Sequence, residues 1–140
     1  MISIRPAVEN DKEAICSVDL IAQHENERWE FIRRAVTSGE CFVAVEGEKV
    51  IGYAVFNYSF YDSGFIEMIY IHFDYRRSGA GAALVRYIES VCHTPKLFTS
   101  TNLSNLPMQS LLAKLGYVLS GVIHNLDEDD PEIVYFKRLR

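Results

Sequence analysis

Apolar and polar positions along the chain recur with two different periods, which predicts a mixture of helices and strands. The first part of the chain begins with a strand at residues 2–5 and continues with two helices. The first helix begins at Asn10, which Glu13 follows three residues later as in a capping box, and the second runs from about Glu27 to a stop at Gly39. The apolar face of the first helix consists of Ala14, Ile15, Val18 and Ala22.

The middle of the chain changes to strand-like runs of β-branched and aromatic residues. Two of these runs, at 41–45 and 50–56, are separated by a turn at 46–49 and predict a hairpin. A third run at 65–73 is apolar at nearly every position, as expected for a central strand buried on both faces. Glu67 is the exception, because a carboxylate is costly to bury unless it is paired or its pKa is raised.

The second half of the chain alternates helices and strands again. Ser78 caps a helix whose inward residues are expected to include Leu84 and Val91, and another helix begins near Asn105 and ends at Gly116. A helix between two strands predicts a parallel crossover. The expected elements are a helix at 78–92, a strand at 96–100, a helix at 105–116 and strands at 117–123 and 133–139.

Length and composition are those of one compact domain that spans residues 1–140. The chain has 140 residues, of which 49% are hydrophobic and 24% charged, and no repeat or flexible linker divides it. Its net charge of −5 disfavours nucleic acid as a partner, because binding to phosphate backbones depends on clustered Lys and Arg. A single domain without a nucleic-acid partner is therefore expected.

The cysteines, the histidines and the first residues argue against a disulfide-rich, secreted, membrane-spanning or metal-binding protein. Cys16, Cys41 and Cys92 are far apart and form no C-x-x-C pair, so we expect reduced, mostly buried thiols. The chain starts with a strand pattern in place of a signal peptide, and no apolar run could span a membrane, so a cytoplasmic protein is expected. No metal is expected, because metal-ligand spacing is absent among His24, His72, His93 and His124.

Small residues are concentrated where the third strand run passes into the next helix. This loop contains Arg76, Arg77, Ser78, Gly79, Ala80, Gly81 and Ala82. Glycine lets an anion approach the backbone closely, and the helix N-terminus contributes about half a positive charge. The two arginines add to that charge, so the loop is predicted to hold a diphosphate.

Other interpretations of this loop remain open or are disfavoured. The simplest one is a tight turn in which glycine serves packing alone. A Walker loop is excluded because no G-K-S or G-K-T follows, and a dinucleotide fingerprint fits poorly because Leu84 occupies its third glycine position.

Three motifs in order give the chain a resemblance to the GNAT superfamily of N-acetyltransferases. The residues from Glu67 to Gly81 resemble the family's central strand and its R-x-x-G-x-G/A loop. Val50-Ile51-Gly52-Tyr53 is similar to the family's third strand, and Asn105 followed by Lys114-Leu115-Gly116-Tyr117 is similar to its last helix. The resemblance covers the chain from Ile4 to about Lys137.

The resemblance implies a fold and a cofactor. The implied fold is α/β with an α+β mixed sheet, mostly antiparallel, with one splayed parallel pair and about four helices. The implied cofactor is acetyl-CoA, whose pantetheine arm lies in the splayed gap and bonds to the backbone of the central strand. The implied contacts are the backbone of Ile69, Tyr70 and Ile71, the loop from Arg76 to Ala82, and the side chain of Asn105. Asn105 can also be a simple helix cap.

Transfer of an acetyl group to a primary amine needs a base, a donor for the oxyanion and a way to handle the departing thiolate. Glu67 is the expected base, although it could equally pair with a basic residue or lie in water. A backbone N–H at Tyr70 or Ile71 is the implied oxyanion donor. The family's usual tyrosine acid is replaced by Leu112, so either no acid is used or another hydroxyl serves, such as Ser110, Tyr70 or Tyr117.

The sequence therefore supports two candidate functions from different classes. The leading one is an acetyl-CoA-dependent N-acetyltransferase that acts by direct attack in a ternary complex. The alternative, suggested by Leu112, is a non-catalytic acyl-CoA-binding or regulatory module.

The acceptor can be either a small molecule or a peptide amine. The oligomeric state is also left open, between a monomer and a homodimer. The acidic run from Asp127 to Asp130 is expected to be a solvated loop, or else to attract a cationic amine. Four aromatic residues either line an acceptor pocket or pack in the core: Trp29, Tyr53, Tyr58 and Tyr61.

Overall fold

The computed structural model describes residues 1–140, which form seven strands, four α-helices and two short 3-10 helices. The elements in chain order are β1 (Ile2–Pro6), η1 (Glu9–Asp11), α1 (Lys12–Val18), α2 (Asn26–Thr37), β2 (Cys41–Glu46), β3 (Lys49–Phe60), β4 (Ser63–Ile71), η2 (Phe73–Tyr75), α3 (Ala80–Val91), β5 (Lys96–Asn102), α4 (Leu106–Lys114), β6 (Val118–Ile123) and β7 (Glu132–Arg138). The helices are too short or too polar to cross a lipid bilayer.

The strands form one mixed sheet in the order β1-β2-β3-β4-β5-β7-β6. The β4–β5 pair is parallel, with Ile66 opposite Thr99 as the last of three residue pairs, whereas β1–β2, β2–β3, β5–β7 and β6–β7 are antiparallel. This confirms the predicted mixed, mostly antiparallel sheet with one parallel pair. The chain divides into two compact units, Met1–Phe56 with Met68–Ser90 and Asn57–Glu67 with Val91–Arg140.

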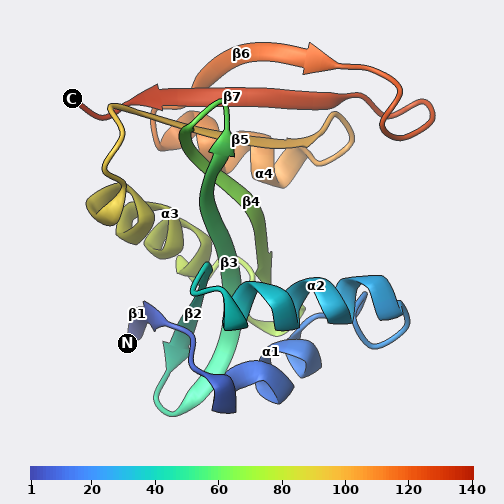
Figure 1. Cartoon of the computed structure of the whole chain (residues 1–140), viewed down its shortest axis with the longest axis vertical. Helices are drawn as coiled ribbons and strands as arrows, with labels where there is room; N and C mark the ends of the chain where they lie inside the picture. Colours follow the sequence, from blue (N-terminus) through green and yellow to red (C-terminus); the bar gives the residue numbers. More distant parts are fainter. The chain divides into compact units, whose positions relative to one another are not determined.

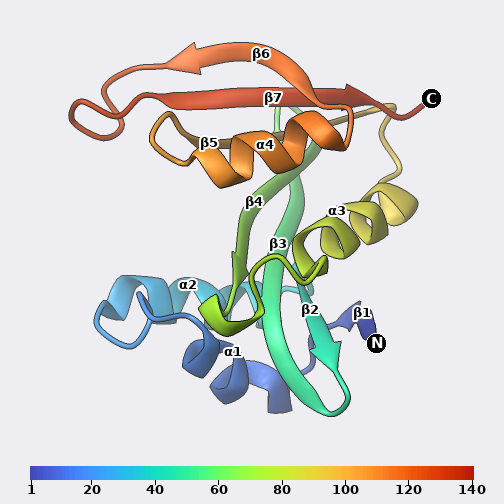
Figure 2. The ribbon, with the colours of Figure 1, turned by 180° about the vertical axis from the view of Figure 1, so that it is seen from behind.

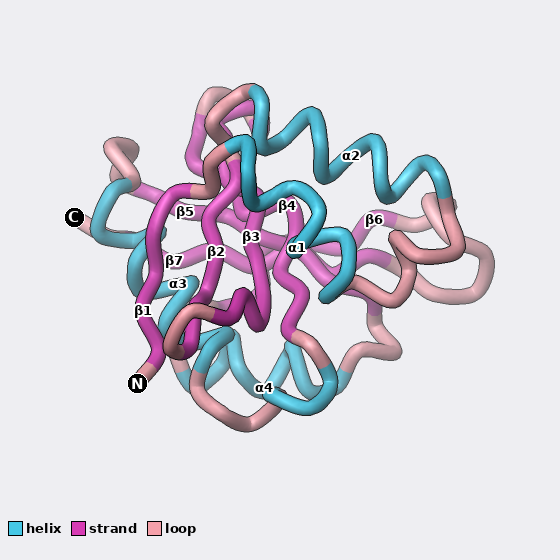
Figure 3. The backbone as a smooth tube through the Cα atoms, turned by 90° about the horizontal axis from the view of Figure 1, so that it is seen from below, coloured by secondary structure: helices cyan, strands magenta, loops and turns pink.

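In the first unit, β1, β2 and β3 lie side by side and carry helices on both faces (Figure 3). Alternate residues of β2 point to opposite faces. Val43 belongs to the buried cluster that α1 and α2 form with the strands, whereas the ring of Phe42 contacts Tyr87 of α3 at 5.5 Å between centroids. The first unit is therefore a sheet with α1 and α2 over one face and α3 over the other (Figure 1).

The start of the first helix differs from the prediction. Asn10 lies inside the 3-10 helix η1, and α1 begins only at Lys12. Asp11 organises this start, because its carboxylate accepts hydrogen bonds from the Val8 backbone N–H at 2.7 Å and from Arg5 at 2.8 Å. The Arg5 guanidinium holds the pKa of the Asp11 carboxyl below its usual value. The helix also ends at Val18, four residues before the predicted Ala22.

In the second unit, α4 lies along one face of β5 and β7 (Figure 2). Leu112 of α4 is fully buried, as is Leu97 of β5 on the covered face. The Asn105 side chain caps α4 by accepting a hydrogen bond from the Met108 N–H at 3.2 Å, and Gly116 follows the helix with a φ of +92°. Both predicted ends of this helix are confirmed. Val91, expected to face inward at the end of α3, is 43% exposed.

Candidate active site

The predicted phosphate loop joins β4 to α3 within the first unit. Arg77 and Gly79 have positive φ angles of 68° and 91°, which turn the chain sharply before the helix begins at Ala80. The Gly79 carbonyl accepts the first helical hydrogen bond from the Ala83 N–H, so Gly79 holds the capping position in place of the predicted Ser78. The Ser78 hydroxyl accepts a hydrogen bond from the Ala80 N–H at 3.3 Å. The N–H groups of the first helical turn have no carbonyl partner inside the helix. The N–H groups between those of Ala80 and Ala83 therefore have no carbonyl partner inside the helix, and their contact with an anion stays a prediction.

Two cationic side chains are held near this loop by aromatic rings. The Arg76 guanidinium lies 5.4 Å from the centre of the Tyr70 ring, and its Nε donates to the Ile71 carbonyl at 3.0 Å. The Lys49 ammonium lies 5.3 Å from the Tyr75 ring. Arg76 and Arg77 are exposed. Positive charge therefore lies near the end of β4 and the beginning of α3, with the exposed Asp74 carboxylate of η2 between them in the chain.

The backbone of β4 at Tyr70 and Ile71 packs tightly against Gly52 of β3. A Cβ atom at Gly52 would lie 2.8 Å from the Tyr70 carbonyl oxygen and 2.6 Å from the Ile71 Cδ1 atom. The Ile51 carbonyl also accepts a hydrogen bond from the His72 N–H at 2.8 Å. Ile69, Tyr70 and Ile71 are half-buried. Gly52 therefore fixes the strand segment that carries the predicted pantetheine and oxyanion contacts.

A buried polar network that the sequence analysis missed lies beside Tyr70. Asp19 is completely buried, and its Oδ2 accepts hydrogen bonds from the Tyr53 hydroxyl at 2.6 Å and from the Arg28 Nε at 3.1 Å. Burial and the Asp19 carboxylate raise the pKa of the Tyr53 hydroxyl far above its ordinary value. The Asp19 Oδ1 accepts the N–H groups of Ile21 and Ala22, which ends α1 and forms the following turn. The sequence signal that could have revealed this network is the charged Asp19 within the apolar run Val18-Asp19-Leu20-Ile21-Ala22.

Tyr70 connects this network to the end of β4. Its ring stacks on Tyr53 with centroids 6.3 Å apart, and its hydroxyl oxygen accepts a hydrogen bond from the Leu20 N–H at 3.3 Å. The segment after α1 thus holds the Tyr70 hydroxyl in place.

Glu67 lies in the second unit, and of the environments that the sequence left open for it the structure shows the exposed one. Its side chain is exposed, and Oε1 accepts a hydrogen bond from the Asn57 amide at 2.8 Å. A carboxylate in contact with water and with a polar neighbour carries no cost of burial. Glu67 follows Ile66, the last residue of β4 that pairs with β5, so it lies where that ladder ends.

A second carboxylate belongs to the same sheet. The Ser100 hydroxyl donates to the Oε2 atom of Glu132 at 2.7 Å. Ser100 and Phe98 lie on one face of β5, and Phe65 of β4 is directly opposite Phe98. Because side chains alternate along a strand, Glu67 lies on the same face as Phe65. Glu67 and Ser100 therefore share this face of the sheet. The sequence analysis did not single out Glu132.

Asn105 and Leu112 are also in the second unit. Asn105 is exposed and caps α4. This capping role does not depend on whether Asn105 also contacts a ligand. Leu112 is fully buried under the sheet. Among the alternative hydroxyls, Ser110 is exposed, and Tyr117 is only 4% exposed with the Lys137 ammonium 5.6 Å from its ring.

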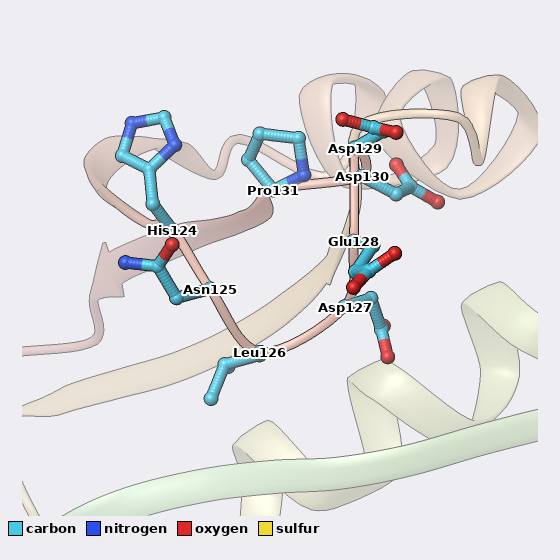
Figure 4. A pocket seen from close by; sticks show the side chains of 8 residues that line it. All are labelled: His124, Asn125, Leu126, Asp127, Glu128, Asp129, Asp130 and Pro131. Carbon is cyan, nitrogen blue, oxygen red and sulfur yellow. The ribbon is translucent and has the colours of Figure 1, made fainter.

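The acidic loop between β6 and β7 surrounds a hollow of about 490 Å³ (Figure 4). The lining residues are His124, Asn125, Leu126, Asp127, Glu128, Asp129, Asp130 and Pro131. Asp127 accepts a hydrogen bond from the Asn102 amide at 2.9 Å, and Asp130 accepts one from the Ser104 hydroxyl at 2.7 Å. Figure 4 shows the Asp127 and Asp129 carboxylates pointing in different directions. The expectation of a solvated loop is confirmed, since 124–129 are exposed.

Of the aromatic candidates, Trp29, Tyr53 and Tyr58 pack against other side chains, whereas Tyr61 is exposed. Tyr53 is buried, the Tyr58 ring stacks on His93 at 4.0 Å, and Tyr61 is 89% exposed at a hairpin tip. The Arg33 guanidinium covers Trp29 at 4.5 Å. The three cysteines are buried free thiols, as predicted. His, Cys, Asp and Glu side chains form no group of three or more that could hold a metal ion.

Comparison with known proteins agrees with this geometry. The sequence model described as the acetyltransferase (GNAT) family matches residues 7–117. A crystal structure of a GNAT-family acetyltransferase from Bacillus cereus ATCC 10987 is 30% identical, with a TM-score of 0.92 over 99% of this chain and 97% of the other. No curated protein sequence matches the chain.

More distant structures share the fold. The ribosomal-protein-S18-alanine N-acetyltransferase from Escherichia coli is 19% identical, with a TM-score of 0.79 over 99% of this chain and 94% of the other. The yncA protein from Salmonella typhimurium, solved with its cofactor acetyl-CoA, is 18% identical, with a TM-score of 0.77 over 99% of this chain and 94% of the other. On the family match and the Bacillus cereus relative, the chain belongs to the GNAT family of acetyltransferases.

Proposed function

We propose that this protein transfers an acetyl group from acetyl-CoA to a primary amine by direct attack in a ternary complex. The observation that supports this most is the turn at Arg77 and Gly79, which opens the first N–H groups of α3 beside two exposed arginines. An anion with two adjacent phosphates matches this arrangement of backbone donors and charge. The acetyl-CoA bound to the similar yncA structure supports the same cofactor.

The proposed cofactor contacts follow from the chain's own donors. The N–H groups of the loop from Arg76 to Ala82 hold the pyrophosphate, and the Arg76 and Arg77 guanidinium groups add charge. Backbone groups of Ile69, Tyr70 and Ile71 hold the pantetheine arm, and the Asn105 amide contributes a further contact while it caps α4.

In the proposed reaction, the amine nitrogen bonds to the thioester carbonyl carbon and the carbon–sulfur bond breaks. Glu67 accepts the proton that the amine loses, and the Asn57 amide orients its carboxylate. A backbone N–H at Tyr70 or Ile71 donates to the developing oxyanion. The Tyr70 hydroxyl, whose oxygen accepts from the Leu20 N–H, gives its proton to the leaving thiolate.

The proposed acceptor is a small-molecule or peptide amine, and the proposed setting is one 140-residue domain in the cytoplasm. Glu132 and the solvated acidic loop favour an acceptor that carries positive charge, because a negative potential raises the local concentration of cations. Streptothricin and ribosomal protein S18 are named as acceptors for similar proteins below 25% identity, which share the fold alone.

The test is acetyl-CoA turnover against a panel of primary amines, with Glu67→Gln compared with the wild type across pH. Loss of the general base is expected to lower kcat/KM about 10²- to 10⁴-fold. Glu13→Gln, which changes an exposed glutamate on α1, is the matched control and should leave turnover unchanged. A Glu67→Gln profile identical to that of the wild type would remove Glu67 as the base.

A non-catalytic CoA-binding module is the second candidate, because Leu112 is buried where the family commonly has a tyrosine. Calorimetry with CoA and with NAD separates the cofactors, and turnover separates the functions. Tight CoA binding without acetylation of any amine would favour the module. Binding of NAD without CoA would contradict both candidates.

A further inference from the structure

The edge strand β6 of the second unit is apolar on both faces. It occupies the end of the strand order, and only β7 pairs with it. Its residues 118–123 carry no charge. The four large side chains are exposed, at 55% for Val118, 62% for Leu119, 46% for Val122 and 39% for Ile123. Sheet edges normally carry charges, prolines, bulges or a covering element, because open strand edges pair with other chains. The β6 strand has a register shift between Leu119 and Gly121 but no charge or proline.

This apolar edge continues into a row of aromatic rings on the face of the unit opposite α4. Val118 is directly opposite Phe136 on β7, and the Phe136 and Phe98 rings stack at 5.7 Å. Phe98 contacts Phe60 at 5.1 Å, and Phe60 stacks on Phe65 at 5.0 Å. The row is half-buried. The edge is therefore the outer end of an extended apolar surface, and burying its side chains would be favourable.

Charges at the two ends of this surface have opposite signs. At the end where β6 begins, Lys96 lies directly opposite Arg138. At the end where β6 finishes, Ile123 lies directly opposite Glu132, and the acidic loop at 127–130 follows. A strand that pairs antiparallel with β6 brings its own beginning beside the end of β6. If that strand is another β6, each basic end lies beside an acidic end.

We propose that the β6 edge binds a second copy of this chain, with the two β6 strands paired antiparallel about a two-fold axis. This arrangement continues the sheet from one copy into the other and covers apolar side chains on both faces of β6. It closes after two copies, because an isologous contact uses the same surface of each. The opposite charges at the ends of β6 favour this partner, because they are self-complementary only in the antiparallel direction.

The first experiment is sedimentation of the whole protein over a range of concentrations. The wild type should sediment at twice the chain mass of 16.0 kDa. Leu119→Lys combined with Val122→Lys should raise the dimer dissociation constant about 100-fold or more, because two exposed apolar side chains per copy lose their contact. Val8→Lys combined with Val91→Lys changes two exposed valines elsewhere, at 57% and 43%, and should leave the dimer intact.

The second experiment exchanges the charges. In one variant, Lys96→Glu with Arg138→Glu makes both ends of the β6 surface acidic. In the other variant, Glu128→Lys with Asp129→Lys adds positive charge to the acidic end. Each variant alone should dimerise more weakly than the wild type, whereas an equimolar mixture should form a heterodimer. A monomeric wild type at all concentrations, a dimer that survives both lysine substitutions in β6, or a mixture that does not associate would each overturn the proposal. Circular dichroism confirms that each variant is folded.

Discussion

The Tyr53 hydroxyl donates a 2.6 Å hydrogen bond to the carboxylate of Asp19, 34 residues earlier in the chain, and both side chains are completely buried. The Arg28 Nε donates to the same oxygen at 3.1 Å. A buried carboxylate is tolerated only when it is hydrogen-bonded and its charge is balanced. The pair therefore joins the turn after α1 to β3, beneath the ring of Tyr70.

Tyr53→Phe should lower the free energy of unfolding by about 1.5–3 kcal/mol, which is typical for a hydrogen bond to a charged group. The pKa of Tyr53 is raised in the folded state, so its contribution is present below the ordinary pKa of 10.0 and declines at higher pH, where the unfolded chain ionises. Urea unfolding of both proteins should show a constant difference up to about pH 9 that shrinks above pH 10. A difference that does not depend on pH would contradict this assignment.

Gly52→Ala should distort β4 at the predicted cofactor strand. The added methyl group would lie 2.8 Å from the Tyr70 carbonyl oxygen, so the strands must separate. We expect a loss of about 1–3 kcal/mol in stability and a higher KM for acetyl-CoA. Gly121→Ala is the control, because a Cβ atom there meets nothing within 4 Å. Equal unfolding midpoints and KM values for the two variants would show that the close approach is unimportant.

Gly79→Ala tests the loop at the start of α3. The φ of +91° is strained for alanine by about 1–2 kcal/mol, although a methyl group there has open space. If the loop must keep this shape to bind pyrophosphate, KM for acetyl-CoA should rise about 5- to 30-fold. Gly39→Ala carries the same kind of strain, at a φ of +76°, at the end of α2. The control should lose similar stability yet bind acetyl-CoA normally, and equal KM values would argue for a turn that serves packing alone.

Tyr70→Phe removes the proposed acid while it keeps the aromatic ring. The stacking on Tyr53 and the contact with Arg76 remain, so the hydroxyl group and its hydrogen bond from the Leu20 N–H are lost. We expect kcat to fall on the order of 10²-fold, with KM for acetyl-CoA changed less than about twofold. Tyr75→Phe, in the adjacent η2 turn, should leave kcat unchanged. Full kcat in Tyr70→Phe would mean that the thiolate departs without this acid.

Elements with a strong local signal were predictable from the sequence. The turn at Gly79 follows from glycine beside a helix start, and α4 follows from Asn105 and Gly116 at its ends. The α2 helix begins within one residue of its predicted start at Glu27. In each case the residues that determine the structure are neighbours in the sequence, so their chemistry can be read locally.

The features that the sequence did not predict depend on distant partners. Asp19 ends α1 early because Tyr53 and Arg28 hold its carboxylate, and no local pattern identifies those partners. Glu67 is exposed because its neighbour across the hairpin is Asn57, although most of its strand is apolar. The sequence left the environment of Glu67 open, because composition alone does not show the side-chain direction or the cross-strand neighbour.

The turn between β3 and β4 has a consequence for engineering. Tyr61 and Asp62 both adopt left-handed backbone angles, with φ values of 52° and 60°, in a two-residue loop where Asn-Gly is the preferred pair. Each such residue costs about 1–2 kcal/mol relative to glycine. The chain therefore contains an unused reserve of thermal stability at a solvent-exposed tip, where the Tyr61 side chain is 89% exposed. The same tip offers a place to open the chain for circular permutation.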